Sequence, residues 1–170
     1  MNVALFGFMA VGKSTVGRLL SERLGYSFVD LDSEIARKEG MEVAEIFSAY
    51  GESRFRELER QAVRRVALLD RQVIACGGGA ILDPVNLEAL RRSSRMVLLT
   101  ASPEEISRRV AIDSGRPLLN VGNRLVKIRE LLEARLPRYC EAADVSVNTD
   151  GIAPEEVADM VLRRIGGVET

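Results

Sequence analysis

Histidine is absent from this 170-residue chain, and its two cysteines, Cys76 and Cys140, are far apart. Without histidine there can be no Ser/His or Cys/His catalytic pair, and most zinc chemistry is excluded as well. Two cysteines without CxxC spacing predict neither a disulfide framework nor a zinc site, so we expect two reduced thiols. Any catalysis must therefore rest on lysine, arginine, aspartate or glutamate side chains.

The chain also has little net charge and no long hydrophobic run. Lysine and arginine number 24 against 25 aspartates and glutamates, which gives no overall reason to expect a nucleic-acid partner held by counterion release. The apolar runs are only a handful of residues long, and the start MNVALF carries no basic leader. We therefore expect no membrane span and no signal peptide, and a cytoplasmic protein.

Short apolar runs alternate with longer segments of helical period, which is typical of a parallel sheet covered by helices. We expect one α/β domain over residues 1–170, with a five-stranded parallel sheet whose strands are residues 2–6, 27–30, 72–76, 96–100 and 145–147. The clearest helix prediction is residues 52–69, where apolar residues recur on one stripe. Further helices are expected after Lys13, Ser33, Pro84, Pro103, Arg124 and Pro154.

Residues 111–123 fit no regular period, because Gly115, Pro117 and Gly122 interrupt them around Arg116. We interpret this stretch as a mobile surface loop between two helices, and thus as a lid. A lid that closes over phosphates would bring a cation to the transferred group and exclude water. Residues 166–170 are expected to be a frayed end. The core helices leave no long exposed apolar stripe, so we expect a monomer.

The first predicted strand is followed directly by GFMAVGKS, a complete GxxxxGK[ST] motif that leads into a helix. Glycine at Gly7 and Gly12 lets the backbone turn tightly and bring its N–H groups to phosphate oxygens. Lys13 can reach the β- and γ-phosphates, and the Ser14 hydroxyl suits Mg²⁺. The alternative is a strand-to-helix turn with a chance lysine. The expected nucleotide contacts are Gly7, Ala10, Val11, Gly12, Lys13, Ser14 and Thr15.

The GxxxxGK[ST] motif, or P-loop, indicates nucleotide binding but does not decide which molecule would accept a phosphoryl group from the nucleotide. Asp30 and Asp32 close the second predicted strand, and alternation aims them toward the carboxyl edge of the sheet, where such sheets bind ligands. Asp32 could bind acceptor hydroxyls, accept the proton of the attacking hydroxyl, or hold Mg²⁺ through water. The alternative is that either aspartate merely caps the helix that begins near Ser33.

A second set of residues that could bind the acceptor molecule is basic. Glu59 falls within the apolar stripe of the predicted helix 52–69, and Arg56 flanks it one turn earlier. We expect an ion pair that orients the guanidinium to grip an anionic group of the acceptor. A structural ion pair without a ligand is the alternative. Arg135 joins this basic set, whereas Arg109 is either a nucleotide contact or part of a solvated helix face.

Three consecutive glycines, residues 77–79, follow Cys76 at the end of the third predicted strand. Glycine permits backbone N–H groups to approach a ligand closely and also permits unusual torsions. We therefore place this turn in the acceptor site, with a merely flexible turn as the alternative. Cys76 itself is expected to be a small buried residue.

In this order, the motifs resemble the shikimate kinase family over nearly the whole chain. The matching elements are GFMAVGKST, VDLD, GESRFRELE, CGGG, RPLL from Arg116 and RLPRY from Arg135. The resemblance implies a nucleoside-monophosphate-kinase type of fold. It also implies transfer of a phosphoryl group from MgATP to a hydroxyl of shikimate, giving shikimate 3-phosphate in aromatic amino-acid (chorismate) biosynthesis.

For the acceptor, the resemblance implies that Arg56 and Arg135 hold the carboxylate of shikimate with help from the backbone of Gly78 and Gly79. Asp32 would grip the hydroxyls and is the candidate base. Since phosphoryl transfer depends mainly on positioning, Asp32 could chiefly orient the hydroxyl.

For the nucleotide, the resemblance implies that Lys13 and Arg116 neutralise charge on the transferred group, that Ser14 binds Mg²⁺, and that Arg109 lies near adenine. One departure from the family pattern is Ala10, which replaces a common glycine. Another is that no aspartate ends the third strand, so Asp32 would have to support Mg²⁺ through water.

Two competing functions remain open. A gluconate-type kinase also phosphorylates an acceptor with a carboxylate and hydroxyls, and only the RPLL and RLPRY elements argue against it. A catalytically idle binding module or nucleotide switch is the other alternative, although every charged position named above is present.

Overall fold

A computed structural model describes residues 1–113 and 121–166. Its sheet has the strand order β2-β3-β1-β4-β5, and every neighbouring pair is parallel. The strands are β1 (Asn2–Phe6), β2 (Ser27–Asp30), β3 (Gln72–Ala75), β4 (Ser94–Thr100) and β5 (Val145–Asn148). The predicted five-stranded parallel sheet is therefore confirmed, with strand ends that differ by at most two residues from the expected ones.

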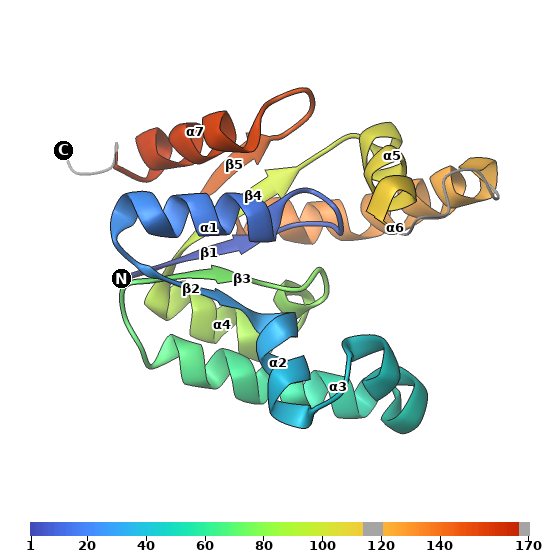
Figure 1. Cartoon of the computed structure of the whole chain (residues 1–170), viewed down its shortest axis with the longest axis horizontal. Helices are drawn as coiled ribbons and strands as arrows, with labels where there is room; N and C mark the ends of the chain where they lie inside the picture. Colours follow the sequence, from blue (N-terminus) through green and yellow to red (C-terminus); the bar gives the residue numbers. More distant parts are fainter. Residues whose placement is uncertain (114–120, 167–170) are drawn as a thin grey trace.

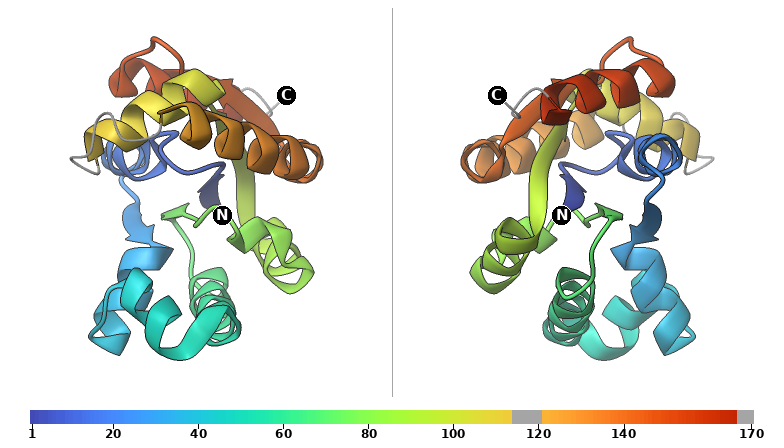
Figure 2. Two further views of the ribbon diagram at one scale, coloured as in Figure 1. Left: turned by 90° about the vertical axis from the view of Figure 1, so that its right-hand side faces the viewer. Right: turned by 90° about the vertical axis from the view of Figure 1, so that its left-hand side faces the viewer.

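Helices lie on both faces of the sheet. In Figure 1, α1 and α7 lie above the sheet and α3 and α4 below it, and the end-on views of Figure 2 show the same two layers. The helices are α1 (Lys13–Leu24), α2 (Leu31–Glu39), α3 (Val43–Ala67), α4 (Pro84–Ser93), α5 (Pro103–Asp113), α6 (Val121–Ala142) and α7 (Pro154–Gly166), and a 3₁₀ turn, η1 (Ala80–Leu82), precedes α4.

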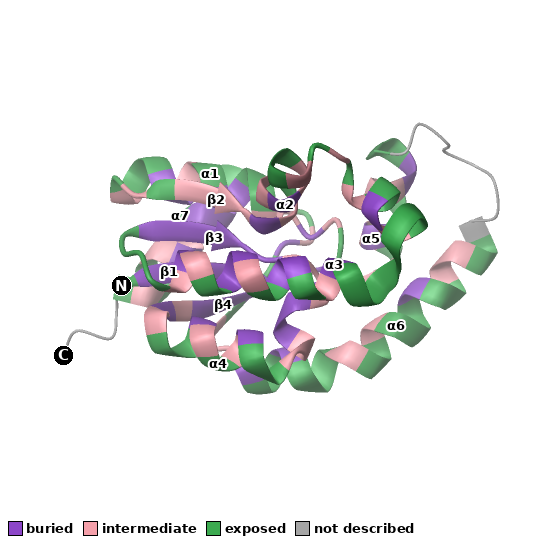
Figure 3. Ribbon diagram, turned by 90° about the horizontal axis from the view of Figure 1, so that it is seen from below, coloured by how far each residue is buried: buried purple, intermediate pink, exposed green. Residues whose placement is uncertain are grey.

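The central strands are apolar because both of their faces are covered. Every residue of β1 and β3 is buried, as Figure 3 shows. The polar exceptions are Asn2 and Gln72: Asn2 Nδ2 donates to the carbonyl oxygen of Leu69 (2.9 Å), and Asn2 Oδ1 accepts from the backbone N–H of Gln72 (3.0 Å). Asn2 thereby ties the start of β1 to the turn after α3 and to the start of β3.

Two expected segments differ by more than two residues from the bounds in the structure. The helix expected at residues 52–69 extends back to Val43, but it is interrupted at Gly51, where φ is 81° and ψ is 172°. The expected lid, residues 111–123, is too wide, because residues 111–113 end α5 and residues 121–123 begin α6. Arg116 and the rest of this stretch lie outside the described residues, as do residues 167–170.

Across the described ranges, none of the helices has both the length and the apolar character needed to span a bilayer.

Helix α1 approaches the sheet closely because Gly17 has no side chain. A Cβ at this buried glycine would lie 2.5 Å from Cε2 of Phe28 and 3.4 Å from Cδ1 of Leu5. The first distance is far below van der Waals contact, so α1 or the Phe28 ring would have to move. Glycine is therefore required here by packing, although it weakens the helix.

We predict that Gly17→Ala destabilises the protein by about 1–3 kcal/mol through overpacking, although alanine is the better helix former by roughly 1 kcal/mol. The free energy of unfolding can be measured in urea by circular dichroism. Gly122→Ala is the matched control, since a Cβ at Gly122 in α6 meets no described atom within 4 Å. Equal stability of the Gly17→Ala variant and the wild type would contradict this account of the helix packing.

Candidate active site

The loop between β1 and α1 has a backbone that glycine makes possible. Gly7 has a φ of 145°, and a Cβ there would lie 2.2 Å from the carbonyl oxygen of Leu99 on β4. Gly12 is the N-cap of α1 with a φ of 98°. Ala10 adopts a φ of 59°, a left-handed conformation that L side chains rarely take. The loop thus forms a tight turn that ends at the N-terminus of α1, where anions bind well.

Lys13 lies back over this loop. Its Nζ donates to the carbonyl oxygens of Gly7 (2.8 Å) and Phe8 (2.9 Å). Burial lowers the pKa of Lys13 to about 8, although the charges of Asp32 and Asp30 oppose the shift. An ammonium group that is desolvated in this way gains by pairing with a phosphate.

The structure distinguishes the two aspartates that follow β2. Asp30 caps α2, because its Oδ1 accepts from the N–H of Ser33 (3.1 Å), and its Oδ2 accepts from the hydroxyl of Ser14 (2.5 Å). Asp32 lies in the first turn of α2 instead. The residue that caps α2 is therefore Asp30 and not Asp32, because α2 begins at Leu31, two residues earlier than expected.

The Asp32 carboxylate faces the glycine turn. A Cβ at Gly77 would lie 3.0 Å from its Oδ1, and this buried oxygen has no hydrogen-bond partner in the described part of the chain. Burial, together with the charge of Asp30, raises the pKa of Asp32, while Lys13 and Arg56 oppose the rise. Asp32 therefore keeps an acceptor atom available for a ligand hydroxyl.

The oxygens beside the P-loop fit Mg²⁺, which prefers hard oxygen ligands and keeps several waters. Ser14 and Asp30 supply a hydroxyl and a carboxylate in mutual contact. In the ranges 1–113 and 121–166, no group of three acidic or cysteine side chains could hold a metal ion by itself. Ser14 and Asp30 are thus the side chains at this position that would hold such an ion.

The expected Arg56–Glu59 pair is present on α3. Arg56 Nη1 donates to Glu59 Oε1 (2.9 Å), and its Nε lies 3.5 Å from Glu52 Oε1. Glu59 is only 1% exposed, and burial raises the pKa of its carboxyl against the opposing effect of Arg56. The guanidinium held by this pair lies beside the glycine turn, because a Cβ placed at Gly79 would be 2.5 Å from Nη2 and 2.6 Å from Nη1.

Each glycine of the turn after β3 leaves room for a charged side chain from another element. A Cβ would overlap Arg56 Nη2 at Gly79 (2.5 Å) and crowd Asp32 Oδ1 at Gly77 (3.0 Å), whereas at Gly78 it would make ordinary contact with Arg135 Nη1 (3.4 Å). The turn therefore brings together side chains from α2, α6 and α3. Arg135 also lies over the ring of Phe8 in the P-loop, 5.7 Å from its centroid.

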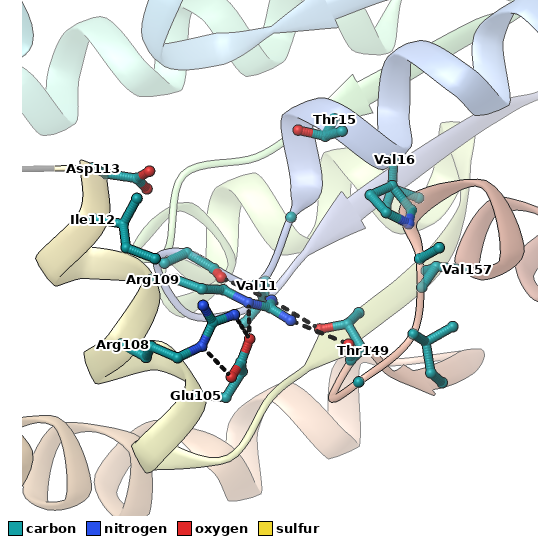
Figure 4. Close-up of a pocket in the computed structure, with 16 residues that line it drawn as sticks. Val11, Thr15, Val16, Glu105, Arg108, Arg109, Ile112, Asp113, Thr149 and Val157 are labelled. Carbon is teal, nitrogen blue, oxygen red and sulfur yellow. Dashed lines mark hydrogen bonds and ion pairs between the residues drawn. The ribbon is translucent and has the colours of Figure 1, made fainter.

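A cavity of about 510 Å³ lies on the other side of the P-loop, between α5 and the start of α7 (Figure 4). Arg109 crosses its wall, donating to Glu105 Oε1 (2.8 Å) and to the carbonyl oxygens of Ala10 (3.1 Å) and Thr149 (3.1 Å). Of the two alternatives for Arg109, the solvated helix face is wrong. The neighbouring Arg108 is 62% exposed and pairs with Glu105.

Sequence reasoning missed three contributors to these sites. Thr149 and Glu105 build the wall of the cavity, and Tyr139 contacts the glycine turn. None of them belongs to a motif of the P-loop type, and both Thr149 and Tyr139 act on residues 40 or more positions away. Of these three residues, only Tyr139 could have been found from the sequence, because it belongs to the RLPRY element.

Known proteins are similar to this chain in both sequence and fold. The sequence model of the shikimate kinase family matches residues 9–166. A shikimate kinase of Thermodesulfovibrio yellowstonii is 43% identical over 162 residues, covering 95% of this chain and 93% of that protein. One of Geobacter sulfurreducens is 46% identical over 156 residues, covering 92% and 86%.

The solved structure of shikimate kinase from Acinetobacter baumannii in complex with shikimate superimposes with a TM-score of 0.91. It is 38% identical, and the match covers 99% of this chain and 94% of the other. The family model, the relatives and the solved structure each match this chain over nearly its full length. The chain therefore belongs to the shikimate kinase family.

Proposed function

We propose that this protein transfers the γ-phosphoryl group of ATP to a hydroxyl of shikimate, giving shikimate 3-phosphate in aromatic amino-acid (chorismate) biosynthesis. The observation that carries the proposal is the meeting of Asp32, Arg56 and Arg135 at the glycine turn, next to the P-loop lysine Lys13. Two cations and one carboxylate match an acceptor that has a carboxylate and hydroxyls.

On the acceptor side, Arg56 and Arg135 would bind the shikimate carboxylate, because a guanidinium fork matches a carboxylate in geometry and charge. The backbone of Gly78 and Gly79 would add N–H donors. The buried, unpaired Oδ1 of Asp32 is suited to accept from the attacking hydroxyl. Asp32 would thereby orient that hydroxyl and take its proton as the oxygen bonds to the γ-phosphorus and the bond from that phosphorus to ADP breaks.

On the nucleotide side, the N–H groups of residues 7–14 would surround the phosphates, and Lys13 would exchange its carbonyl partners for phosphate oxygens. Mg²⁺, when bound by Ser14 and Asp30, neutralises phosphate charge; a water-mediated contact from Asp32 is proposed as well. Arg109 would line the base pocket. Arg116 lies outside the described residues and is proposed to contact the transferred group.

We also propose a single-domain monomer of the cytoplasm that binds neither nucleic acid nor membrane. The near balance of 24 basic and 25 acidic residues supports the absence of a polyanionic partner. All five strands belong to one sheet, which supports a single domain.

The acceptor can be tested by ADP release in a coupled assay with MgATP and shikimate, gluconate or no acceptor. We expect turnover that depends on shikimate. Turnover with gluconate alone would keep the kinase and overturn the acceptor. ATP binding without acceptor-dependent turnover would favour an idle module.

We predict that Arg56→Ala raises the KM for shikimate by roughly 10- to 100-fold, since charge-assisted hydrogen bonds contribute about 1.5–3 kcal/mol. The KM for ATP should change less than about twofold, because Arg56 lies on the acceptor side of the P-loop. Arg54→Ala is the matched control: Arg54 is on the same helix, is exposed and pairs with Glu57. An unchanged affinity for shikimate would overturn the role of Arg56.

The lowered pKa of Lys13, about 8, predicts an alkaline limb in nucleotide binding. Phosphate binds the protonated amine, so rising pH removes the required charge from the free protein. The KM for ATP should increase above pH 8, approaching tenfold per pH unit. In Lys13→Arg the guanidinium keeps its charge at these pH values, so the KM for ATP should depend less on pH above pH 8. A wild-type KM for ATP that is constant from pH 7 to 9.5 would rule out this titration.

A further inference from the structure

Tyr139 is a buried tyrosine whose hydroxyl points at the glycine turn. It lies on α6 with 1% of its surface exposed, and its ring packs edge-on against Phe6 with 5.9 Å between the centroids. Its hydroxyl donates a hydrogen bond to the carbonyl oxygen of Gly78. Neither substrate-binding proposal above uses this side chain.

The three carbonyl groups of the glycine turn have different partners. Gly77 accepts from the N–H of Ala80 (3.0 Å) and Gly79 accepts from the N–H of Leu82 (3.1 Å), so both are held by the backbone of η1. The middle carbonyl, that of Gly78, is held by the side chain of Tyr139. The orientation of the middle peptide therefore depends on a residue 61 positions away.

That orientation decides where a backbone donor points. The carbonyl of Gly78 and the N–H of Gly79 belong to one planar trans peptide, so they point in opposite directions. Glycines on both sides leave this plane unusually free to rotate. By holding the carbonyl, Tyr139 turns the N–H of Gly79 away from α6. Gly79 is the glycine that lies against the Arg56 guanidinium.

The same tyrosine lies beside the second acceptor arginine. Arg135 precedes Tyr139 by four residues on α6, which puts both on one side of the helix. A Cβ at Gly78 would lie 3.4 Å from Arg135 Nη1 and 3.6 Å from the Tyr139 hydroxyl. Burial raises the pKa of Tyr139, against the effect of Arg135, so the hydroxyl stays protonated and remains a donor at neutral pH.

We propose that Tyr139 is a positioning residue for the acceptor: it holds the Gly78–Gly79 peptide so that the N–H of Gly79 faces the same ligand group as the Arg56 guanidinium, which lies against Gly79. Tyr139 itself does not touch the acceptor. This inference rests on the proposed function, since it assigns the oriented N–H to the carboxylate of shikimate.

Tyr139→Phe tests the hydroxyl alone, because phenylalanine keeps the ring and its packing against Phe6. We expect the KM and the calorimetric Kd for shikimate to rise about tenfold, as for the loss of one well-oriented hydrogen bond. The KM for ATP should stay within about twofold of the wild type. Tyr26→Phe and Tyr50→Phe make the same change at the other two tyrosines of the chain and should leave both substrates unaffected.

The outcomes separate positioning from plain stabilisation. If Tyr139→Phe lowers the melting temperature but leaves the Kd for shikimate unchanged, the hydroxyl only stabilises the fold and the inference is overturned. An equal rise in the KM of both substrates would likewise indicate general loosening and overturn it. If the wild type itself shows no turnover with shikimate, the proposed function fails, and the inference falls with it.

Discussion

Space at the three glycines after β3 is the constraint on which the rest of the site depends. The missing Cβ atoms of Gly77 and Gly79 admit Asp32 and Arg56, and Arg135 lies within contact distance of Gly78, so charged side chains from three helices meet at this turn. A substituent at Gly79 would overlap the Arg56 guanidinium, at 2.5 Å. Close approach of backbone and charge is a known use of glycine. Here it turns the end of one strand into the place where charged side chains from three helices meet.

Several buried charges lie close together at this turn, and the structure can accommodate them because each has a neighbour of opposite sign. Lys13 has Asp30 and Asp32 as neighbours, and Glu59 has Arg56. A buried charge without a partner would cost several kcal/mol or lose its ionisation. This pairing is incomplete, because the buried atoms Asp32 Oδ1 and Glu59 Oε2 have no hydrogen-bond partner within the described ranges. Such preorganised, incompletely paired groups favour a ligand that completes them.

Local features were predictable from the sequence and long-range ones were not. The P-loop is a contiguous motif, and the Arg56–Glu59 pair follows from helical spacing within one element. The roles of Asp30 and Asp32 were left open because they depend on a helix start that differs by two residues. The first part of α3 was missed because the break at Gly51 hides its period. The position of Thr149 is set by folding across the sheet, which no local pattern encodes.

The hydrogen bonds of Arg109 have a consequence for inhibitor chemistry. Its guanidinium joins the wall of the cavity between α5 and α7 to the P-loop through the carbonyl of Ala10 and to the loop after β5 through Thr149. A compound that displaced this side chain would leave several polar partners unpaired and would pay a desolvation penalty for each. A compound that fills the cavity without displacing Arg109 would leave those bonds intact.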